Sequence, residues 1–488
     1  MTNTIVGRRE ELQKLDLFYK SAKAEFLVIL GRRRIGKTFL VQNYFTNKDC
    51  IFFHVTGLKD GSLSDQIENF TRSMGKAFYQ GAELKPRKRW VDVFEYLTET
   101  INRIVPQKKK VVLFFDELPW MATQRSKLLQ AIDHYWNRYW SFDARIRLIA
   151  CGSSASWLLE KLIHDKGGLH NRITYQIELE PFTLKESKQF LAQKNIKLTN
   201  EQILKLYMAI GGVPLYFDQI IKGLSADQSI DEICFNKSGL LFKEFERLFS
   251  SLFKHHEVIE ELVRIIAEHR YGISQIKLME KSSKSIGGRL KKRLSELENA
   301  GFVESFVPYH HKEKGIYYRI IDEYTLFYLK WIEPIAKTLR KHDTEKGYWQ
   351  FKQKSASWLS WAGYAYESIC YRHIRQIRNA LGISPGAEIV SWRYSPRKQS
   401  DEVGAQIDLL FDRDDNVITI CEIKYTTNFF AIDKKYAHEL LRKVEVFRKH
   451  TRTNKQIFIA MISANGLKPT MYSEELITGV VTLNDLFE

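Results

Sequence analysis

Short, mostly apolar runs alternate with amphipathic stretches through the first 180 residues of the chain. The runs are typical of strands that are buried on both faces of a parallel sheet. They comprise residues 26–30, 50–55, 111–115, 147–151 and 173–179. Between them, residues 39–45, 90–105 and 128–140 have the period of amphipathic helices. The alternation predicts a doubly wound α/β domain over residues 1–180, with ligand bound at the carboxyl ends of the strands.

The pattern changes after residue 180. Residues 181–245 are helical in pattern, with a Gly-Gly break at 211–212, and predict a small helical lid. Residues 250–345 predict helices over 258–268, 273–279 and 285–300, followed by strands over 302–307 and 315–321, which is the order of a winged helix-turn-helix. Residues 350–488 contain two strand-type runs joined by a polar turn and followed by a basic helix. The expected fold class is therefore α/β multidomain, with four parts in this order.

A phosphate-binding motif follows the first predicted strand. Its spacing is G-x-x-x-x-G-K-[ST], in which two glycines let successive backbone N–H groups point at phosphate oxygens. Lys37 is expected to reach the β- and γ-phosphates, and the Thr38 hydroxyl to bind Mg²⁺. The residues expected to contact the nucleotide are Gly31, Arg32, Arg33, Arg34, Ile35, Gly36, Lys37 and Thr38. ATP and Mg²⁺ are the predicted cofactors.

Polar residues at the ends of the other predicted strands supply the remaining chemistry. Asp116 and Glu117 end the third run, where Asp116 would orient Mg²⁺ and Glu117 would polarise the attacking water. Ser153 or Ser154, after the fourth run, is expected to sense the γ-phosphate, or else to cap a helix. Arg172 precedes the fifth run and is either an arginine finger, acting in cis or on a neighbouring subunit, or a surface arginine.

Two further motifs complete a family resemblance. One is the V-G-R-R-E run that contains Gly7 and Arg8, and the other is the G-G-V-P turn that ends at Pro214. Together with the P-loop and the D-E pair they resemble the prokaryotic ATPase family of the STAND/AAA+ superfamily, whose P-loop domains are of the ASCE/AAA+ type. The resemblance implies that Gly7 and Arg8 line the adenine and that Pro214 leans on the base. Members commonly carry a C-terminal domain catalogued as DUF234.

Lysines and arginines gather around the third predicted helix of the 250–345 region. Its leucines share one face at helical spacing, so the cations occupy the remaining faces. In a winged helix-turn-helix this helix can enter the major groove of DNA while the wing contacts phosphates. The residues expected to contact DNA are Lys284, Arg289, Lys291, Lys292, Arg293 and Lys312. The alternative is a winged helix that binds protein.

A second constellation lies on the predicted C-terminal hairpin. A hairpin centred on Asp414 would place Asp408 opposite Ile420. Because side chains alternate with a period of two, Asp408, Glu422 and Lys424 would share one face. Two carboxylates there can bind Mg²⁺ or Mn²⁺, and the lysine can orient water at a phosphate.

This D-x13-E-x-K hairpin resembles the core of PD-(D/E)xK nucleases, which have a restriction-endonuclease-like fold. Glu367, on a predicted upstream helix, is expected to add a carboxylate. Ile407 stands before Asp408, where the named proline of the motif would be. The alternatives are an exposed charged hairpin, or a nuclease-like fold kept for binding without cleavage.

Composition narrows the function classes. The formal net charge of +17 over 488 residues indicates a polyanionic partner, and DNA is the one we expect. The five cysteines form no C-x-x-C pair, which argues against a disulfide framework or a zinc knuckle. No apolar run is long enough to span a bilayer and no signal peptide is evident, so a cytoplasmic protein without a membrane partner is expected.

The favoured function is an ATPase whose nucleotide state controls action on DNA. The first alternative is an ATP-dependent regulator that binds DNA or protein and cuts nothing. The second is a STAND-type signalling switch, in which ATP binding drives assembly into a homo-oligomer.

Overall fold

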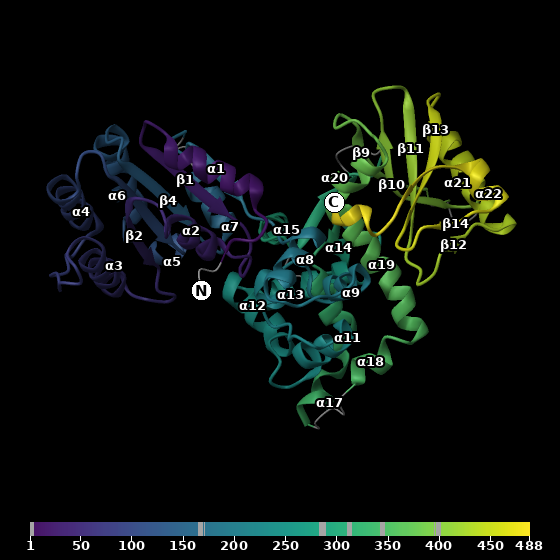
Figure 1. Cartoon of the computed structure of the whole chain (residues 1–488), viewed down its shortest axis with the longest axis horizontal. Helices are drawn as coiled ribbons and strands as arrows, with labels where there is room; N and C mark the ends of the chain where they lie inside the picture. Colours follow the sequence, from purple (N-terminus) through teal and green to yellow (C-terminus); the bar gives the residue numbers. More distant parts are fainter. Residues whose placement is uncertain are drawn as a thin grey trace. The chain divides into compact units, whose positions relative to one another are not determined.

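The computed structural model describes residues 4–163, 169, 171–282, 289–309, 315–341, 347–394, 396 and 402–488. They form two compact units (Figure 1), of which the first comprises Met1–Pro181 with Ser295–Gly301 and the second comprises Phe182–Leu294 with Phe302–Glu488. No helix among these residues is both long and apolar enough to cross a lipid bilayer.

A five-stranded parallel sheet forms the centre of the first unit. Its order is β2-β3-β4-β1-β5, so that β4 lies between the strand before the phosphate loop and the strand that ends in Asp116. The predicted α/β domain with a parallel sheet is thereby confirmed. The strands are β1 (Glu25–Leu30), β2 (Cys50–Thr56), β3 (Lys110–Asp116), β4 (Ile146–Cys151) and β5 (Tyr175–Glu178).

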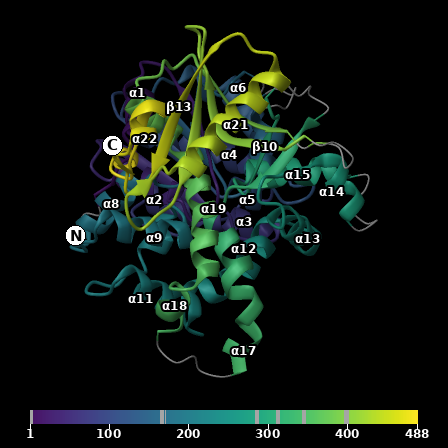
Figure 2. The same ribbon diagram turned by 90° about the vertical axis from the view of Figure 1, so that its right-hand side faces the viewer.

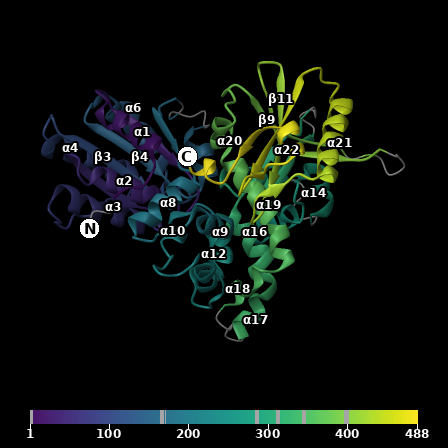
Figure 3. The same ribbon diagram turned by 45° about the vertical axis from the view of Figure 1, so that its right-hand side comes forward.

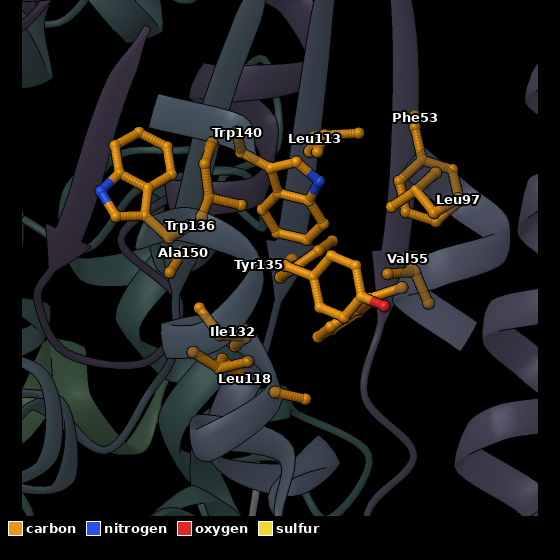
Figure 4. Close-up of a cluster of buried hydrophobic side chains, with 14 of the residues drawn as sticks. Phe53, Val55, Leu97, Leu113, Leu118, Ile132, Tyr135, Trp136, Trp140 and Ala150 are labelled. Carbon is orange, nitrogen blue, oxygen red and sulfur yellow. The ribbon is translucent and has the colours of Figure 1, made fainter. Parts of the chain in front are cut away.

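Helices cover both faces of this sheet because its buried strands present apolar side chains to both sides. Phe26 and Val28 of β1 belong to the core under α3 (Leu63–Phe78), α4 (Trp90–Ile104) and α6 (Leu128–Arg138), part of which is drawn in Figure 4. Leu27 and Ile29 point the other way, to α1 (Arg9–Lys20) and α2 (Lys37–Phe45). The shorter helices of this unit are α5 (Leu118–Met121) and α7 (Ala155–Leu158).

The second unit begins with short helices and a small sheet. The first helices are α8 (Leu184–Gln193), α9 (Asn200–Ile210), α10 (Pro214–Phe217), α11 (Ala226–Ile230) and α12 (Glu244–Leu252). They are followed by α13 (His256–Ala267), β6 (Ile273–Ser274), α14 (Gln275–Lys281), α15 (Leu290–Asn299), β7 (Val303–Phe306) and β8 (Tyr317–Ile320). The three strands form an antiparallel sheet of order β6-β8-β7.

The second helix of this group begins later than predicted. A helix was expected from Ile273, but Ile273 pairs with Tyr318 in the small sheet. Ser274 then caps the helix, since its side chain accepts a hydrogen bond from the backbone N–H of Lys277. The helix accordingly starts at Gln275.

A mixed five-stranded sheet of order β15-β13-β11-β10-β9 forms the C-terminal part of the second unit. Its first three strands along the chain are antiparallel neighbours, whereas β11, β13 and β15 run parallel. The helices α19 and α21 that flank it can be followed in Figures 2 and 3. Its strands are β9 (Glu388–Tyr394), β10 (Ala405–Asp412), β11 (Val417–Lys424), β13 (Gln456–Ser463) and β15 (Ile477–Val481). The other elements here are α16 (Glu323–Phe327), α17 (Ala336–Lys341), α18 (Tyr348–Lys352), α19 (Ala356–Arg372), α20 (Ile374–Ala380), α21 (Lys434–Thr451) and α22 (Met471–Leu476), with β12 (Phe430–Ala431) pairing β14 (Leu467–Lys468).

The predicted register of the β10–β11 hairpin is wrong by two residues. Leu410, and not Asp408, lies opposite Ile420. The pairing is centred on Asp415 and not on Asp414, and Asn416, the last residue before β11, adopts a left-handed conformation (φ 64°). A shift of two residues preserves the parity of the pairing between Leu410 and β11, but the pairing of β10 with β9 is irregular between Ile407 and Leu410, so alternation does not fix the sheet face of Asp408.

Candidate functional site

The loop between β1 and α2 is shaped to surround an anion. Gly31 and Gly36 have φ angles of 136° and 92°, which side chains rarely allow. A Cβ atom on Gly31 would lie 2.5 Å from the carbonyl oxygen of Leu179, so no larger residue fits there. Gly36 is the N-cap of α2 and offers no capping side chain, which leaves the first N–H groups of the helix available to phosphate oxygens.

Lys37 and Thr38 place the two other groups that a nucleotide requires. The buried Lys37 ammonium donates to the carbonyl oxygens of Gly31 (2.8 Å) and Arg32 (2.9 Å), and burial lowers the pKa of Lys37. Thr38 Oγ1 donates to Asp116 Oδ2 at 3.0 Å. A hydroxyl and a carboxylate in contact beside an anion loop are the donors that Mg²⁺ prefers, so these residues fit Mg²⁺ bound with ATP.

Glu117 and Ser153 are brought together at the carboxyl edge of the sheet. Glu117 Oε2 accepts hydrogen bonds from the backbone N–H of Ser153 (2.8 Å) and from its Oγ (2.9 Å). The backbone of Glu117 is left-handed (φ 49°), which turns the side chain away from β3 towards the end of β4. Ser154 is the N-cap of α7 but its side chain makes no capping hydrogen bond.

Three further side chains hold Asp116, and sequence reasoning missed them. Thr56 Oγ1 donates to Asp116 Oδ2 (3.2 Å), Cys151 Sγ donates to Oδ1 (2.8 Å), and His54 Nε2 lies 3.6 Å from Oδ2. Burial would raise the pKa of Asp116, but the contacts with His54, Cys151 and Thr38 outweigh it and the pKa is lowered. Thr56 is the register partner of Asp116 on β2. The sequence did contain a signal for these contacts, because the three side chains lie at the ends of the second and fourth apolar runs.

The remaining residues predicted around the nucleotide lie in different places. Arg8 (φ 56°) is buried and donates to the carbonyl oxygens of Glu180 (2.6 Å) and Ile35 (3.4 Å), which ties the segment after Gly7 to the phosphate loop. Pro214 is in the second unit, at the first turn of α10.

Arg172 is not brought to the phosphate loop within its own chain. It is exposed and precedes β5 at the amino edge of the sheet, where Thr174 pairs with Phe26. The loop lies at the opposite, carboxyl edge because β1 and β5 are parallel. The expectation that Arg172 acts as an arginine finger on its own chain is therefore wrong. Its action on a neighbouring subunit stays a prediction.

In the second unit, Glu422 lies at the centre of the charged cluster predicted on β10 and β11. Its buried carboxylate accepts from Lys443 Nζ through both oxygens (3.0 and 2.9 Å), from Tyr436 (2.8 Å), and pairs with Lys424 at 3.2 Å. Burial would raise the pKa of Glu422, but the charges of Lys443 and Lys424 outweigh it, so the pKa is lowered.

Asp408 and Glu367 adjoin this cluster. Burial and the charge of Glu422 raise the pKa of Asp408. Burial also raises the pKa of Glu367 to about 7, with a further contribution from Asp408. Arg270 donates to Glu367 Oε1 at 2.5 Å.

The cluster does not form a ready metal site in this arrangement. Over the described ranges, no three His, Cys, Asp or Glu side chains gather so as to hold a metal ion. The carboxylate that Glu367 was expected to add is paired with Arg270, and its part in the site stays a prediction. Cationic side chains occupy both oxygens of Glu422, so a divalent cation would have to replace these ion pairs.

The predicted DNA-contacting residues lie on and before α15. Leu290, Leu294 and Leu297 are buried on one face of this helix. Arg289, Lys291 and Lys292 are exposed, whereas Arg293 is half-buried. Lys284 and Lys312 lie outside the described residues.

The parallel sheet, the phosphate loop and the carboxylates at the strand ends define a P-loop ATPase domain. Residues 5–220 match the family described as an ATPase domain predominantly from Archaea. The chain is 24% identical over 442 residues to the uncharacterized protein MJECL04 of Methanocaldococcus jannaschii, covering 90% of this chain and 91% of the relative. It is 22% identical over 335 residues to the uncharacterized ATP-binding protein MJECL15 of the same organism (56% and 84%). Among solved structures, the Walker-type ATPase PABY2304 of Pyrococcus abyssi matches with 19% identity and a TM-score of 0.47, over 67% of this chain and 96% of that one.

Proposed function

We propose that this protein is an AAA+/STAND-like ATPase that hydrolyses ATP and whose nucleotide state controls its action on DNA. The observation that carries the hydrolytic part is the pair formed by Glu117, which follows β3, and Ser153, which follows β4, next to the strand that leads into the phosphate loop. The relative MJECL15 is named an ATP-binding protein, which agrees with it.

The residues divide the work of hydrolysis among them. The N–H groups of the loop and Lys37 bind the phosphates, and Lys37 offsets the charge that moves onto the β-phosphate as its bond to the γ-phosphorus breaks. Thr38 and Asp116 would hold Mg²⁺, which supplies further positive charge at the phosphates. Glu117 orients the attacking water and accepts its proton, and Ser153 fixes the carboxylate for that role.

Phosphate release from ATP tests this proposal directly. The full chain with Mg²⁺ should release phosphate, and EDTA should stop the reaction. Lys37→Ala should bind ATP far more weakly, because it removes the ammonium at the β- and γ-phosphates. A wild-type chain that releases no phosphate above background refutes the hydrolytic function.

The proposed DNA contact rests on the elements between α13 and β8. Their order, helix, strand, helix, helix and two strands, is that of a winged helix-turn-helix in which α15 would be the helix presented to the major groove. Its exposed cations and the net charge of +17 support binding to phosphates. Residues 181–245, which precede these elements in the chain, are the proposed lid.

A second candidate function is phosphodiester hydrolysis by the cluster around Glu422. The observation in its favour is the closeness of three carboxylates and a lysine. The charge of Asp408 raises the pKa of Glu367, the charge of Glu422 raises the pKa of Asp408, and Lys424 acts on both in the opposite sense. The mixed sheet with α21 crossing between β11 and β13 agrees with the proposed restriction-endonuclease-like fold.

Incubation with plasmid and oligonucleotide DNA, in Mg²⁺ or Mn²⁺ and with or without ATP, tests this second function. Cleavage should disappear in Asp408→Ala, Glu422→Ala and Lys424→Ala. Mn²⁺ should raise the melting temperature of the wild type and of Lys424→Ala, but not of Glu422→Ala, since a ligand bound only to the folded state stabilises it. A wild type that neither cleaves nor gains stability leaves the non-cleaving DNA-binding regulator as the better account.

A further inference from the structure

A groove of about 610 Å³ runs along α19 in the second unit. Its volume is that of ordinary ligand sites. Three segments wall it, namely the end of α13 with the following turn, residues 326–333, and the first half of α19. The lining side chains used below are Arg264, Arg270, Lys330 and Tyr364.

The groove is lined by three cationic and two acidic side chains. Arg264 is paired with Glu333 (2.7 Å), and Glu268 is the other acid. Lys330 is exposed, and within the part of the chain that the structure describes it has no hydrogen-bond or ion-pair partner. Arg264 also pairs with Glu260 (3.3 Å) and Arg270 pairs with Glu367 (2.5 Å), so Lys330 is the uncompensated cation, and a phosphate would share the two guanidinium groups with these carboxylates.

Aromatic rings and guanidinium groups alternate beside these charges. The Arg270 guanidinium lies 5.3 Å from the ring centre of Tyr364 and 5.4 Å from that of Tyr271. Arg393 lies 5.4 Å from the Tyr271 ring. Tyr271 is 41% exposed, so its ring is accessible to a partner. Exposed rings next to arginines are the platforms on which unpaired bases stack.

The groove leads to the charged cluster. Tyr364 and Glu367 are three residues apart on α19 and therefore lie on the same side of the helix. Arg270 contributes to the groove and donates to Glu367, and the charge of Asp408 acts on both Arg270 and Glu367. A chain bound along the groove would have its phosphates near the carboxylates and Lys424.

We propose that this groove binds single-stranded DNA. Lys330 and the two arginines contact the phosphates, a base stacks on Tyr271, and the strand continues to the cluster around Glu422. The strand must be unpaired because a base within a duplex cannot offer its face to Tyr271. The assignment rests on the proposed action on DNA and specifies which form of DNA the second unit takes.

Binding of fluorescein-labelled oligo-dT to the full chain, followed by anisotropy in EDTA without nucleotide, tests the proposal. Lys330→Glu and Tyr271→Ala should each weaken binding about tenfold. Tyr271→Phe keeps the ring and should bind as the wild type does. Two matched controls lie away from the groove: Lys222→Glu makes the same charge change at an exposed lysine, and Phe142→Ala removes an exposed ring.

The proposal would be overturned if the groove variants bound oligo-dT as tightly as the wild type does. It would also be overturned if the two control variants lost as much affinity for oligo-dT as the groove variants. Duplex binding and phosphate release, measured on the same preparations, separate this failure from that of the proposed function. A wild type that binds duplex but not oligo-dT overturns the groove alone. One that hydrolyses ATP and binds neither DNA overturns the groove and the DNA partner, but not the ATPase. Tighter binding of oligo-rU than of oligo-dT would overturn the choice of DNA.

Discussion

Replacing Glu117 by Gln changes the chemistry of the proposed base while it leaves its surroundings in place. Glu117 Oε2 now accepts from the N–H and the hydroxyl of Ser153. The carbonyl oxygen of a Gln side chain can accept the same two hydrogen bonds. The groups that bind the nucleotide, Lys37 and the loop N–H groups, are untouched, so ATP affinity should change by less than about twofold.

The loss of rate follows from the proton that the water must give up. An amide is not basic, so Glu117→Gln leaves the attacking water without an acceptor at the end of β3. A positioned general base contributes about 10²–10⁴-fold to a rate. That range corresponds to about 3–5 kcal/mol of transition-state stabilisation, which should appear as a lower kcat with an unchanged dissociation constant for ATP.

Two measurements on each variant check this prediction, namely steady-state phosphate release and equilibrium binding of a fluorescent ATP analogue. Glu95→Gln is the matched control, since it makes the same substitution at an exposed carboxylate on α4. Turnover of Glu117→Gln at the wild-type rate would refute the assignment of the base. Loss of nucleotide binding would show instead that Glu117 is needed to hold the loop.

Three further predictions concern other parts of the chain. Ser153→Ala removes one of the two hydrogen bonds to Glu117 and should lower kcat about tenfold while ATP binding is retained; a change as large as that of Glu117→Gln would show that Ser153 does more than position the carboxylate. Charge reversal at Arg289, Lys292 and Arg293 should weaken duplex binding and reduce the slope of log K against log salt by about one for each DNA phosphate that the variant no longer neutralises, with basal ATPase activity unchanged; an unaltered slope would favour a protein-binding role for α15. His373 is fully buried, accepts a hydrogen bond from the backbone N–H of Leu184 (3.0 Å), and burial lowers its pKa to about 4. As pH drops, His373 is therefore protonated near pH 6.5 in the unfolded chain but only near pH 4 in the folded chain. The free energy of unfolding should consequently fall by about 3 kcal/mol between pH 8 and pH 4. His373→Asn should remove this dependence in urea titrations at a series of pH values, and a wild type with the same slope as the variant would contradict it.

The residues of the ATP site could be predicted because their arrangement depends on local signals. The phosphate loop has its spacing within eight consecutive residues, and the apolar runs mark the strands before Asp116 and before Ser153. Parallel strands all end at one edge of their sheet, so polar residues that follow such runs meet there. The same rule explains why Arg172, which precedes its strand, lies at the other edge.

The register of the C-terminal hairpin was harder to predict from the sequence. Its parity was predicted correctly, since the alternation of side chains is visible in the sequence. The pairing was off by two residues because it depends on the backbone conformation of Asn416, and neither helix nor strand periodicity reports a left-handed residue in a turn.

Sequence by itself determined the elements and the chemistry at their ends, because periodicity, turn residues and motif spacing are properties of neighbouring residues. Only the tertiary structure decided which side chains from distant segments meet them. Lys443 reaches Glu422 from α21, and Arg270 reaches Glu367 across 97 residues of chain. These contacts arise from the packing of whole elements and leave no trace in any local pattern, which is why the charges that surround these two carboxylates became visible only in the folded chain.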